Sequence, residues 1–136
     1  MRALAIISLL PLAACGGASI SDAARGFDDA AVQRLYQMPV PEYYANLRLA
    51  RVLAERCNRY AFDTRLDLDI NQRRNTVGRG SFSALRQRDA IDAMTDVRKR
   101  EFQAKHGFAV DAGDPCAAAD RETAEQTALS AVLVAG

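Results

Sequence analysis

The sequence lacks tryptophan and contains one histidine, three cysteines and almost no net charge. A formal charge of +1 and a hydrophobic fraction of 49% exclude a strongly basic nucleic-acid-binding chain, a collagen-like repeat and a chain that is disordered by composition. The 136 residues are enough for one small domain. No catalytic or cofactor motif is complete in the sequence, so its first residues and its cysteines carry most of the information.

The amino-terminal segment has the pattern of an export signal. Arg2 precedes the apolar stretch 3–12, which only Ser8 and Pro11 interrupt. An apolar run of this length is too short for a membrane-spanning helix, which needs about 20 residues. Leu12 occupies a position where ordinary signal cleavage favours a small residue, which argues against a simple soluble secreted product.

The tetrapeptide Leu12-Ala13-Ala14-Cys15 resembles the lipobox of bacterial lipoproteins. The resemblance implies that the signal is removed before Cys15 and that this cysteine carries the lipid that anchors the chain to a membrane. Gly16 follows the cysteine in place of an aspartate, which in such lipoproteins is compatible with transfer to the periplasmic face of the outer membrane. Retention in the inner membrane is the less favoured alternative.

The lipobox divides the chain into three expected parts. These are a signal peptide over 1–14, a lipidated tether over 15–21 and a helical domain over 22–136. Removing residues 1–14 takes away Arg2 and leaves 17 basic and 17 acidic side chains, so the mature chain is formally neutral.

With Cys15 committed to lipid, Cys57 and Cys116 remain. Two thiols in an oxidising compartment usually pair. A redox or metal role is disfavoured because the chain has no Cys-x-x-Cys motif and no histidine close in sequence to either cysteine. We therefore expect one structural disulfide, worth roughly 4 kcal/mol on the chain-entropy model.

Hydrophobic periodicity predicts an all-α domain, a small bundle of about four helices stapled by this disulfide. The expected helices cover 22–38, which Pro39 ends; 41–75; about 84–106, with Ser83 as N-cap and Gly107 as C′ residue; and 115–134, with Asp114 as N-cap. The alternation at 66–70 also allows a short strand, although a helix is favoured. The residues expected to build the core are Tyr43, Leu47, Leu53, Tyr60, Ile91, Met94 and Phe102.

Residues 47–134 also show a weaker resemblance, to a family of small exported helical proteins of unknown function. It depends on the order of Cys57, a Gly-x-Ser-like turn, a charged helix ending in Lys105-His106-Gly107, Cys116, and a terminal helix with Glu122 and Leu133. That family has no established activity to transfer. The resemblance therefore implies only the helical fold and the disulfide.

Two motif fragments are incomplete. The Asp-x-Asp-x-Asn pattern at 67–71 matches the opening of a calcium loop, but Gln72 and Gly78 stand where glycine and glutamate are required. The segment Gly78-Arg79-Gly80, which follows Arg73-Arg74, resembles part of a phosphate-binding loop whose remaining positions are missing. We predict a solvated turn there and no metal or cofactor site.

His106 is the only imidazole, and it is expected in the last turn of a helix, where a cation is favourable at the negative end of the helix dipole. We therefore predict a capping role for it. Glu55 and Glu101 each lie among arginines on a charged helix face, which indicates exposed salt bridges rather than the paired carboxylates of a glycan hydrolase. The sequence therefore predicts no catalytic residue.

Basic charge is concentrated in the middle of the chain. Residues 46–106 hold fourteen basic and eight acidic side chains, whereas 107–136 hold one basic and five acidic. A basic middle could face anionic lipid headgroups or an acidic partner, although sixteen arginines against two lysines also indicate that arginine is the default cation of this proteome. Tyr44 and Arg48 are the candidate partner contacts, because tyrosine and arginine are enriched where interfaces concentrate their binding energy. The favoured alternative is that Tyr43 lies in the core and Tyr44 only covers it.

The sequence thus predicts a non-catalytic, membrane-anchored lipoprotein of the envelope that binds or supports another envelope protein and has no nucleic-acid partner. The alternative is an enzyme acting on cell-wall glycan, or an inhibitor of such an enzyme, for which Glu101 and His106 would be the first residues to test. A deep cleft with perturbed carboxylates would favour the enzyme. An exposed apolar patch on a filled bundle would favour the binding module.

Overall fold

The computed structural model describes residues 25–136. The predictions for the signal peptide 1–14, for lipidation of Cys15 and for the tether 15–21 concern residues outside this part. The same holds for residues 22–24, where the first helix was expected to begin. Lipidation therefore stays a prediction.

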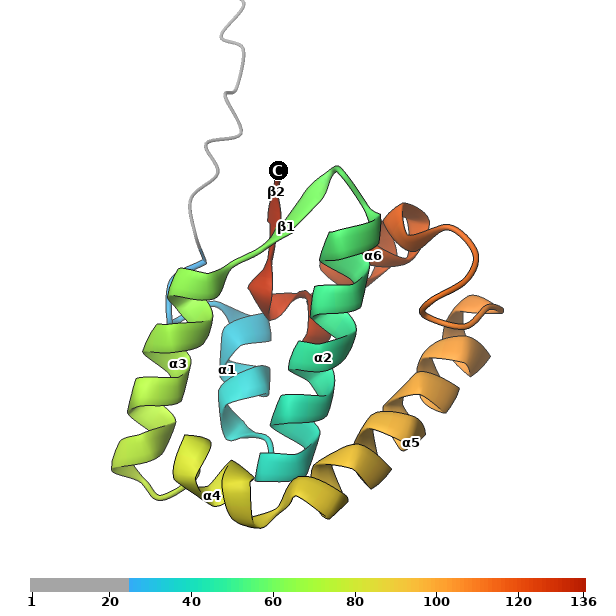
Figure 1. Cartoon of the computed structure of the whole chain (residues 1–136). Coiled ribbons are helices and arrows are strands. Elements are labelled where there is room, and N and C mark those ends of the chain that lie inside the picture. Colours follow the sequence, from blue (N-terminus) through green and yellow to red (C-terminus); the bar gives the residue numbers. More distant parts are fainter. Residues whose placement is uncertain (1–24) are drawn as a thin grey trace, which may run out of the picture.

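Helices dominate the described part of the chain, which confirms the predicted all-α class (Figure 1). Residues 25–136 form six α-helices rather than about four, together with one 3₁₀ helix and one two-stranded sheet. The elements are α1 Ala30–Gln37, α2 Val40–Arg56, β1 Tyr60–Phe62, α3 Thr64–Thr76, α4 Ser81–Arg86, α5 Arg88–His106, α6 Pro115–Ala124, η1 Leu129–Val132 and β2 Leu133–Ala135. Over this range no helix is both long enough and apolar enough to cross a bilayer.

Helix α2 is central to the domain and packs against α1, α5, α6, η1 and β1 (Figure 1). The buried apolar residues of α2 recur at helical spacing, so they form one face against which the neighbouring elements pack. Five of the predicted core residues are buried: Tyr43, Leu47, Leu53, Ile91 and Phe102. The other two, Tyr60 and Met94, are half-buried.

The predicted helix over 41–75 is wrong as a continuous element. Helix α2 ends at Arg56, and β1 pairs antiparallel with β2, so that Phe62 lies opposite Leu133. The partner strand comes from the other end of the domain, so no local pattern reveals the pairing. Helix α3 then begins after Asp63, whose carboxylate accepts a hydrogen bond from the Leu66 amide at 2.9 Å. The helical interpretation of 66–70 is confirmed.

Residues 25–29, which were expected to be helical, are not, and α1 begins at Ala30. Asp29 caps it by accepting hydrogen bonds from the amides of Ala31 and Val32. The helix expected over about 84–106 is divided at Gln87 into α4 and α5. Ser83 is not an N-cap. It lies inside α4, and its hydroxyl donates to the carbonyl of Gly78.

The helix expected over 115–134 ends at Ala124. Gln126 adopts a φ of 49°, which turns the chain into η1 and β2. The segment 128–133 that follows is buried, with exposed fractions of 7% or less, so it fills the centre of the domain instead of lying on its surface. Two predicted helix boundaries are confirmed: α5 ends at Gly107, which has a φ of 81°, and α6 begins after Asp114.

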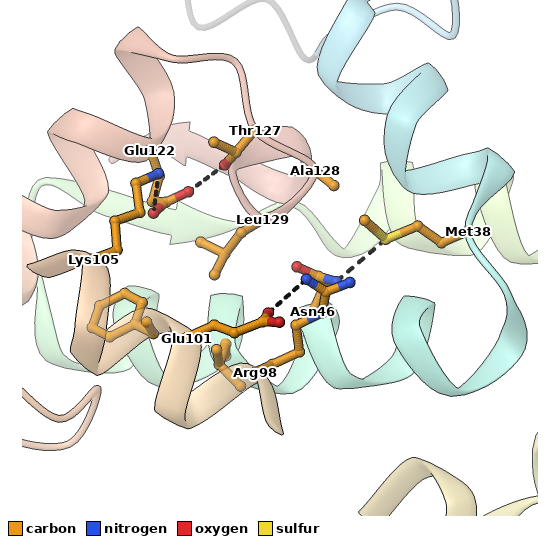
Figure 2. A pocket seen from close by; sticks show the side chains of 11 residues that line it. Met38, Asn46, Arg98, Glu101, Lys105, Glu122, Thr127, Ala128 and Leu129 are labelled. Carbon is orange, nitrogen blue, oxygen red and sulfur yellow. Dashed lines mark hydrogen bonds and ion pairs between the residues drawn. The ribbon is translucent and has the colours of Figure 1, made fainter. Parts of the chain in front are cut away.

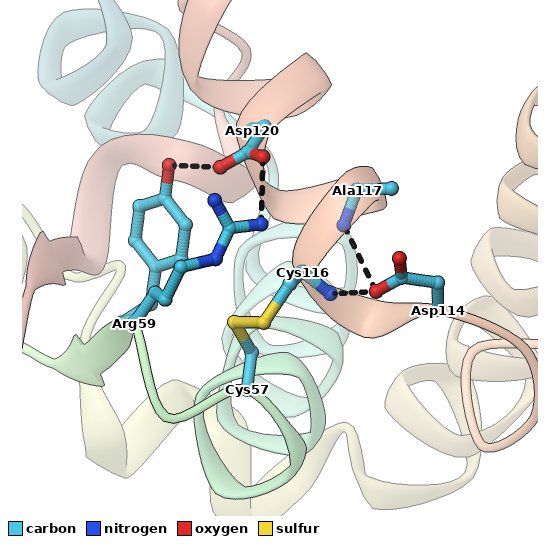
Figure 3. Close-up of a disulfide and its surroundings, with 7 residues drawn as sticks. Cys57, Arg59, Asp114, Cys116, Ala117 and Asp120 are labelled. Atoms are coloured by element: carbon cyan, nitrogen blue, oxygen red, sulfur yellow. Dashed lines mark hydrogen bonds and ion pairs between the residues drawn. A yellow bond between two sulfur atoms is a disulfide. The ribbon is translucent and has the colours of Figure 1, made fainter.

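The structure contains the predicted disulfide between Cys57 and Cys116 (Figure 3). The two Cα atoms are 5.1 Å apart, within the usual range for a disulfide. Asp114 fixes the first turn of α6 by accepting hydrogen bonds from the amides of Cys116 at 2.9 Å and Ala117 at 3.2 Å. The bond therefore ties the end of α2 to the start of α6.

Candidate functional site

One pocket, of about 250 Å³, opens between α2, α5 and the segment after α6 (Figure 2). We call it the polar pocket. Glu101, Lys105 and Glu122 line it, together with apolar side chains such as Leu129. It is therefore the place where the residues of the enzyme hypothesis have to be judged.

The Glu122 carboxylate is the centre of a buried polar cluster at this pocket. His106 Nε2 lies 2.6 Å from Glu122 Oε1, and Lys105 Nζ lies 2.9 Å from the same oxygen. The Thr127 hydroxyl donates to Oε2. The side chains of His106 and Glu122 are only 3% and 6% exposed, so the cluster joins the end of α5 to α6 away from water.

The contacts of Glu122 keep it ionised. Burial alone would raise the pKa of its carboxyl, but hydrogen bonds from Thr127, Lys105 and His106 bring the pKa below its ordinary value. In the same cluster burial lowers the pKa of Lys105, and the carboxylates of Glu125 and Glu122 raise it above its ordinary value. A general acid needs a raised pKa, so this arrangement is that of an ion-pair network.

The three residues considered for catalysis do not form a reactive site. His106 is in the last turn of α5 as predicted, but its buried ring contacts Glu122. Glu101 is exposed, and its Oε2 accepts from Arg98 Nη1 at 2.8 Å. Glu55 is exposed on α2, outside the polar pocket.

A second pocket, of about 370 Å³, lies between α2, α3, α4 and α5, and we call it the α4 pocket. Tyr44 and Arg48, the candidate partner contacts, both line it. The buried side chains of Leu47 and Ile91 form its apolar base. The structure thus brings Tyr44 and Arg48 together with an apolar surface that the sequence alone did not place beside them.

Polar contacts hold the walls of the α4 pocket in position. Arg48 Nη1 donates to Asp92 Oδ1 at 2.6 Å and to Thr95 Oγ1 at 3.2 Å. The Tyr44 hydroxyl donates to Asn71 Oδ1 at 3.4 Å, which links α2 to α3. Arg48 is nevertheless half exposed, so its guanidinium remains open to a ligand.

Asp67 is the carboxylate in this pocket. It accepts hydrogen bonds from the Tyr43 hydroxyl at 3.1 Å and from Arg51 Nη2 at 3.0 Å. Burial raises the pKa of Asp67, and these two partners offset part of the rise. Burial and the nearby carboxylate raise the pKa of Tyr43. Asp67 is therefore occupied with structural partners.

The aspartates of the calcium-like fragment do not converge. Asp67 faces Tyr43 and Arg51, whereas Asp69 pairs with Arg73 at 3.1 Å one turn along α3. Among residues 25–136 no group of three or more histidine, cysteine or acidic side chains is arranged to hold a metal ion.

Arg74 is the residue that sequence reasoning missed. The sequence offered no reason to assign it a role, but it is fully buried. Its guanidinium donates to the carbonyls of Tyr36, Met38 and Arg79 at 2.5, 2.9 and 3.1 Å and lies over the Tyr43 ring. Arg74 thus fastens the end of α3 to the connection between α1 and α2. A run of arginines in sequence gives no sign of which one is buried.

Among residues 25–136, three of the four exposed large apolar side chains lie on α4 or just before it. Phe82 and Leu85 are 78% and 59% exposed, and Val77, just before α4, is 51% exposed. Every residue of α4 keeps part of its surface in water. Phe82 and Leu85 are three residues apart, so they share one face of the helix, and Leu85 also lines the α4 pocket.

Comparisons of this chain with models of protein families, with curated proteins and with solved structures found no match. The resemblance of residues 47–134 to small exported two-cysteine proteins therefore stays an expectation from sequence.

Proposed function

We propose that this chain is a lipid-anchored protein of the bacterial envelope whose helical domain is a non-catalytic module that binds another envelope protein. Cys15 would hold it at the periplasmic face of the outer membrane. The lipobox resemblance supports the anchor. The surface over α4 supports the binding role.

The observation that carries the proposal is the exposure of Phe82 and Leu85 beside the α4 pocket. Burying either side chain on folding would be favourable, yet α4 places both in water. Contiguous exposed apolar side chains are typical of surfaces that bind a partner. Tyr44 and Arg48, on the wall of the same pocket, are residue types that contribute strongly to interfaces.

The alternative, an enzyme acting on cell-wall glycan, receives no support from the polar pocket. Such enzymes need one protonated carboxyl and one ionised carboxylate on either side of a bond. Here the hydrogen bonds of Glu122 lower its pKa, and Arg98 binds Glu101. The contacts of Glu122 with Lys105 and His106 therefore hold α5 and α6 together.

Intact-mass measurement of the protein extracted from membranes tests the anchor. We expect loss of residues 1–14 and the added mass of acyl chains on Cys15. A mature terminus at another residue, with an unmodified Cys15, would contradict it.

Co-purification from detergent-solubilised membranes tests the binding role. After crosslinking in cells, the double variant Phe82→Ser/Leu85→Ser should lose a partner that the wild type recovers. Replacing Tyr44 and Arg48 together should weaken the same recovery. Leu68→Ser is the control, because Leu68 is 65% exposed but lies outside the α4 pocket. Equal recovery of the partner by all variants, with intact folding, would exclude this surface as the binding site. Turnover of a cell-wall substrate by the purified protein would overturn the non-catalytic role.

A further inference from the structure

We propose that the partner segment bound over α4 is acidic and amphipathic, with an apolar side chain that enters the α4 pocket and carboxylates that meet the arginines around it. This inference rests on the proposed function and adds the chemistry of the partner. Its surface consists of the exposed side chains of α4 and the adjoining pocket walls. We call it the α4 surface, and its members are Tyr44, Arg48, Phe82, Leu85, Arg86 and Arg88.

The α4 pocket has the character needed to take an apolar side chain. Leu47 and Ile91 are almost fully buried beneath it, and Ala84 and Leu85 line it from α4. Its volume of about 370 Å³ leaves room for a large side chain. An apolar base with charged groups at the rim fixes both the position and the orientation of a ligand.

The charge around this pocket is predominantly positive. Of the five arginines between 70 and 88, Arg74 is buried and Arg73 pairs with Asp69, whereas Arg86 and Arg88 are exposed on and just after α4. Across residues 25–136, neither Arg86 nor Arg88 has a carboxylate within ion-pair distance. Three arginines and one aspartate line the pocket, and that aspartate, Asp67, is already bound to Arg51.

This asymmetry indicates an acidic partner. Asp92 on α5 is held by Arg48 at 2.6 Å. Asp89 follows Arg88 in the sequence, and one aspartate against Arg86 and Arg88 leaves the excess positive. Complementary charge selects a partner and speeds its association. An amphipathic helix laid into an apolar groove is a common way to combine both kinds of contact.

A protein segment is favoured over an anionic bilayer by the position of α4. The segment that leads into α1, where a membrane anchor would join the domain, lies at the opposite end of the molecule from α4 (Figure 1). Helix α4 is therefore remote from the point at which an anchor would join the domain. A concave pocket also accepts a projecting side chain, which a flat headgroup surface does not offer.

Site-specific photocrosslinking of the full chain in the source bacterium tests the inference. The photoreactive residue benzoylphenylalanine replaces Phe82, and in a matched control it replaces Leu68. We expect Phe82 to crosslink to a protein segment rich in aspartate or glutamate, with apolar residues at helical spacing, and Leu68 not to do so. A synthetic peptide of the crosslinked segment is then titrated against the purified protein.

Charge reversal separates the α4 surface from general electrostatics. Arg86→Glu/Arg88→Glu should weaken binding of that peptide by about tenfold or more. Lys99→Glu/Arg100→Glu makes the same change in net charge on exposed residues of α5, roughly 18 Å further along the helix from Arg88, and should leave the affinity within about twofold. Added salt should weaken wild-type binding and have little effect on the double glutamate variant of Arg86 and Arg88.

The possible results distinguish this inference from the proposed function. A crosslinked segment that is neutral or basic, or equal weakening by both double variants, would overturn the acidic-partner inference and leave the binding module in place. Crosslinks to lipid alone would show that the surface meets a membrane and would overturn the inference and the protein-binding role together. An absence of any protein crosslink from Phe82 would likewise overturn both.

Discussion

The closed junction of α5 with α6 and the open surface over α4 differ in how completely their side chains are satisfied. At the junction, Glu122 is buried and bound by three neighbours, and the disulfide lies at the other end of α6. Over α4, Phe82 and Leu85 face water, and Arg86 and Arg88 point to no carboxylate among residues 25–136. One region pairs its polar groups within the fold, and the other leaves its side chains exposed to solvent.

The two regions also differ in what a substitution should do. Where buried charges are mutually paired, removing one partner leaves another without compensation, so folding stability suffers. Where apolar and cationic side chains are exposed, removing them should leave the fold intact and affect binding only. Four predictions test this difference.

The disulfide should give the largest effect on stability. Replacing both Cys57 and Cys116 by alanine should lower the free energy of unfolding by roughly 4 kcal/mol, because the bond closes a loop across 59 residues of sequence. Urea unfolding of the purified protein measures this change, and the wild type with added reductant should unfold at the same urea concentration as the variant. A wild type whose stability does not respond to reductant would contradict the structural role.

Breaking the Glu122 cluster should come next. Glu122→Gln should cost about 3 kcal/mol of stability, because it leaves Lys105 without its buried counter-charge. Glu125→Gln is the matched control, since Glu125 also binds Lys105 but is exposed, and it should change stability little. If the two variants unfold alike in urea, the buried cluster does not hold α5 against α6.

Lowering the pH should change the contributions of Glu122 and Asp67 to folding stability in opposite directions. The pKa of Glu122 is lowered in the folded chain, so its stabilising contribution is present above its ordinary value of 4.5 and is lost as the pH falls through the lowered pKa. The pKa of Asp67 is raised from 3.8, so its contribution is present at low pH and is lost as the pH rises through the raised pKa. Glu122→Gln should therefore flatten the acid loss of stability and Asp67→Asn should steepen it. Urea unfolding at a series of acid pH values checks the signs, and the same slope in both variants would refute the comparison.

The smallest effect on stability is expected over α4. Phe82→Ser/Leu85→Ser should keep the free energy of unfolding within about 0.5 kcal/mol of the wild type, because neither side chain is buried in the fold. Urea unfolding and circular dichroism measure this directly. A large loss of stability would mean that α4 belongs to the core and is not a free surface.

Local signals in the sequence predicted much of the helical structure. Asp114 with Pro115 begins α6 and Gly107 ends α5, because capping depends on residues within one turn. The buried face of α2 follows from its apolar spacing. The pairing of Cys57 with Cys116 follows from the number of cysteines left once Cys15 is assigned to lipid. Such features depend on neighbours in sequence or on simple counting.

Other features were decided only by tertiary structure. β1 exists because Phe62 meets Leu133, and the burial of Arg74 depends on carbonyl groups from the connection between α1 and α2. His106 became part of a buried network only because α6 brings Glu122 within 2.6 Å of it. In each case the deciding partner lies far away in sequence, and the free energy of burying a polar group depends on whether that partner arrives. The sequence alone determined which segments prefer to be helical and which cysteines pair. The packing of those segments determined which buried polar side chains found hydrogen-bond partners and which side chains, over α4, were left in water.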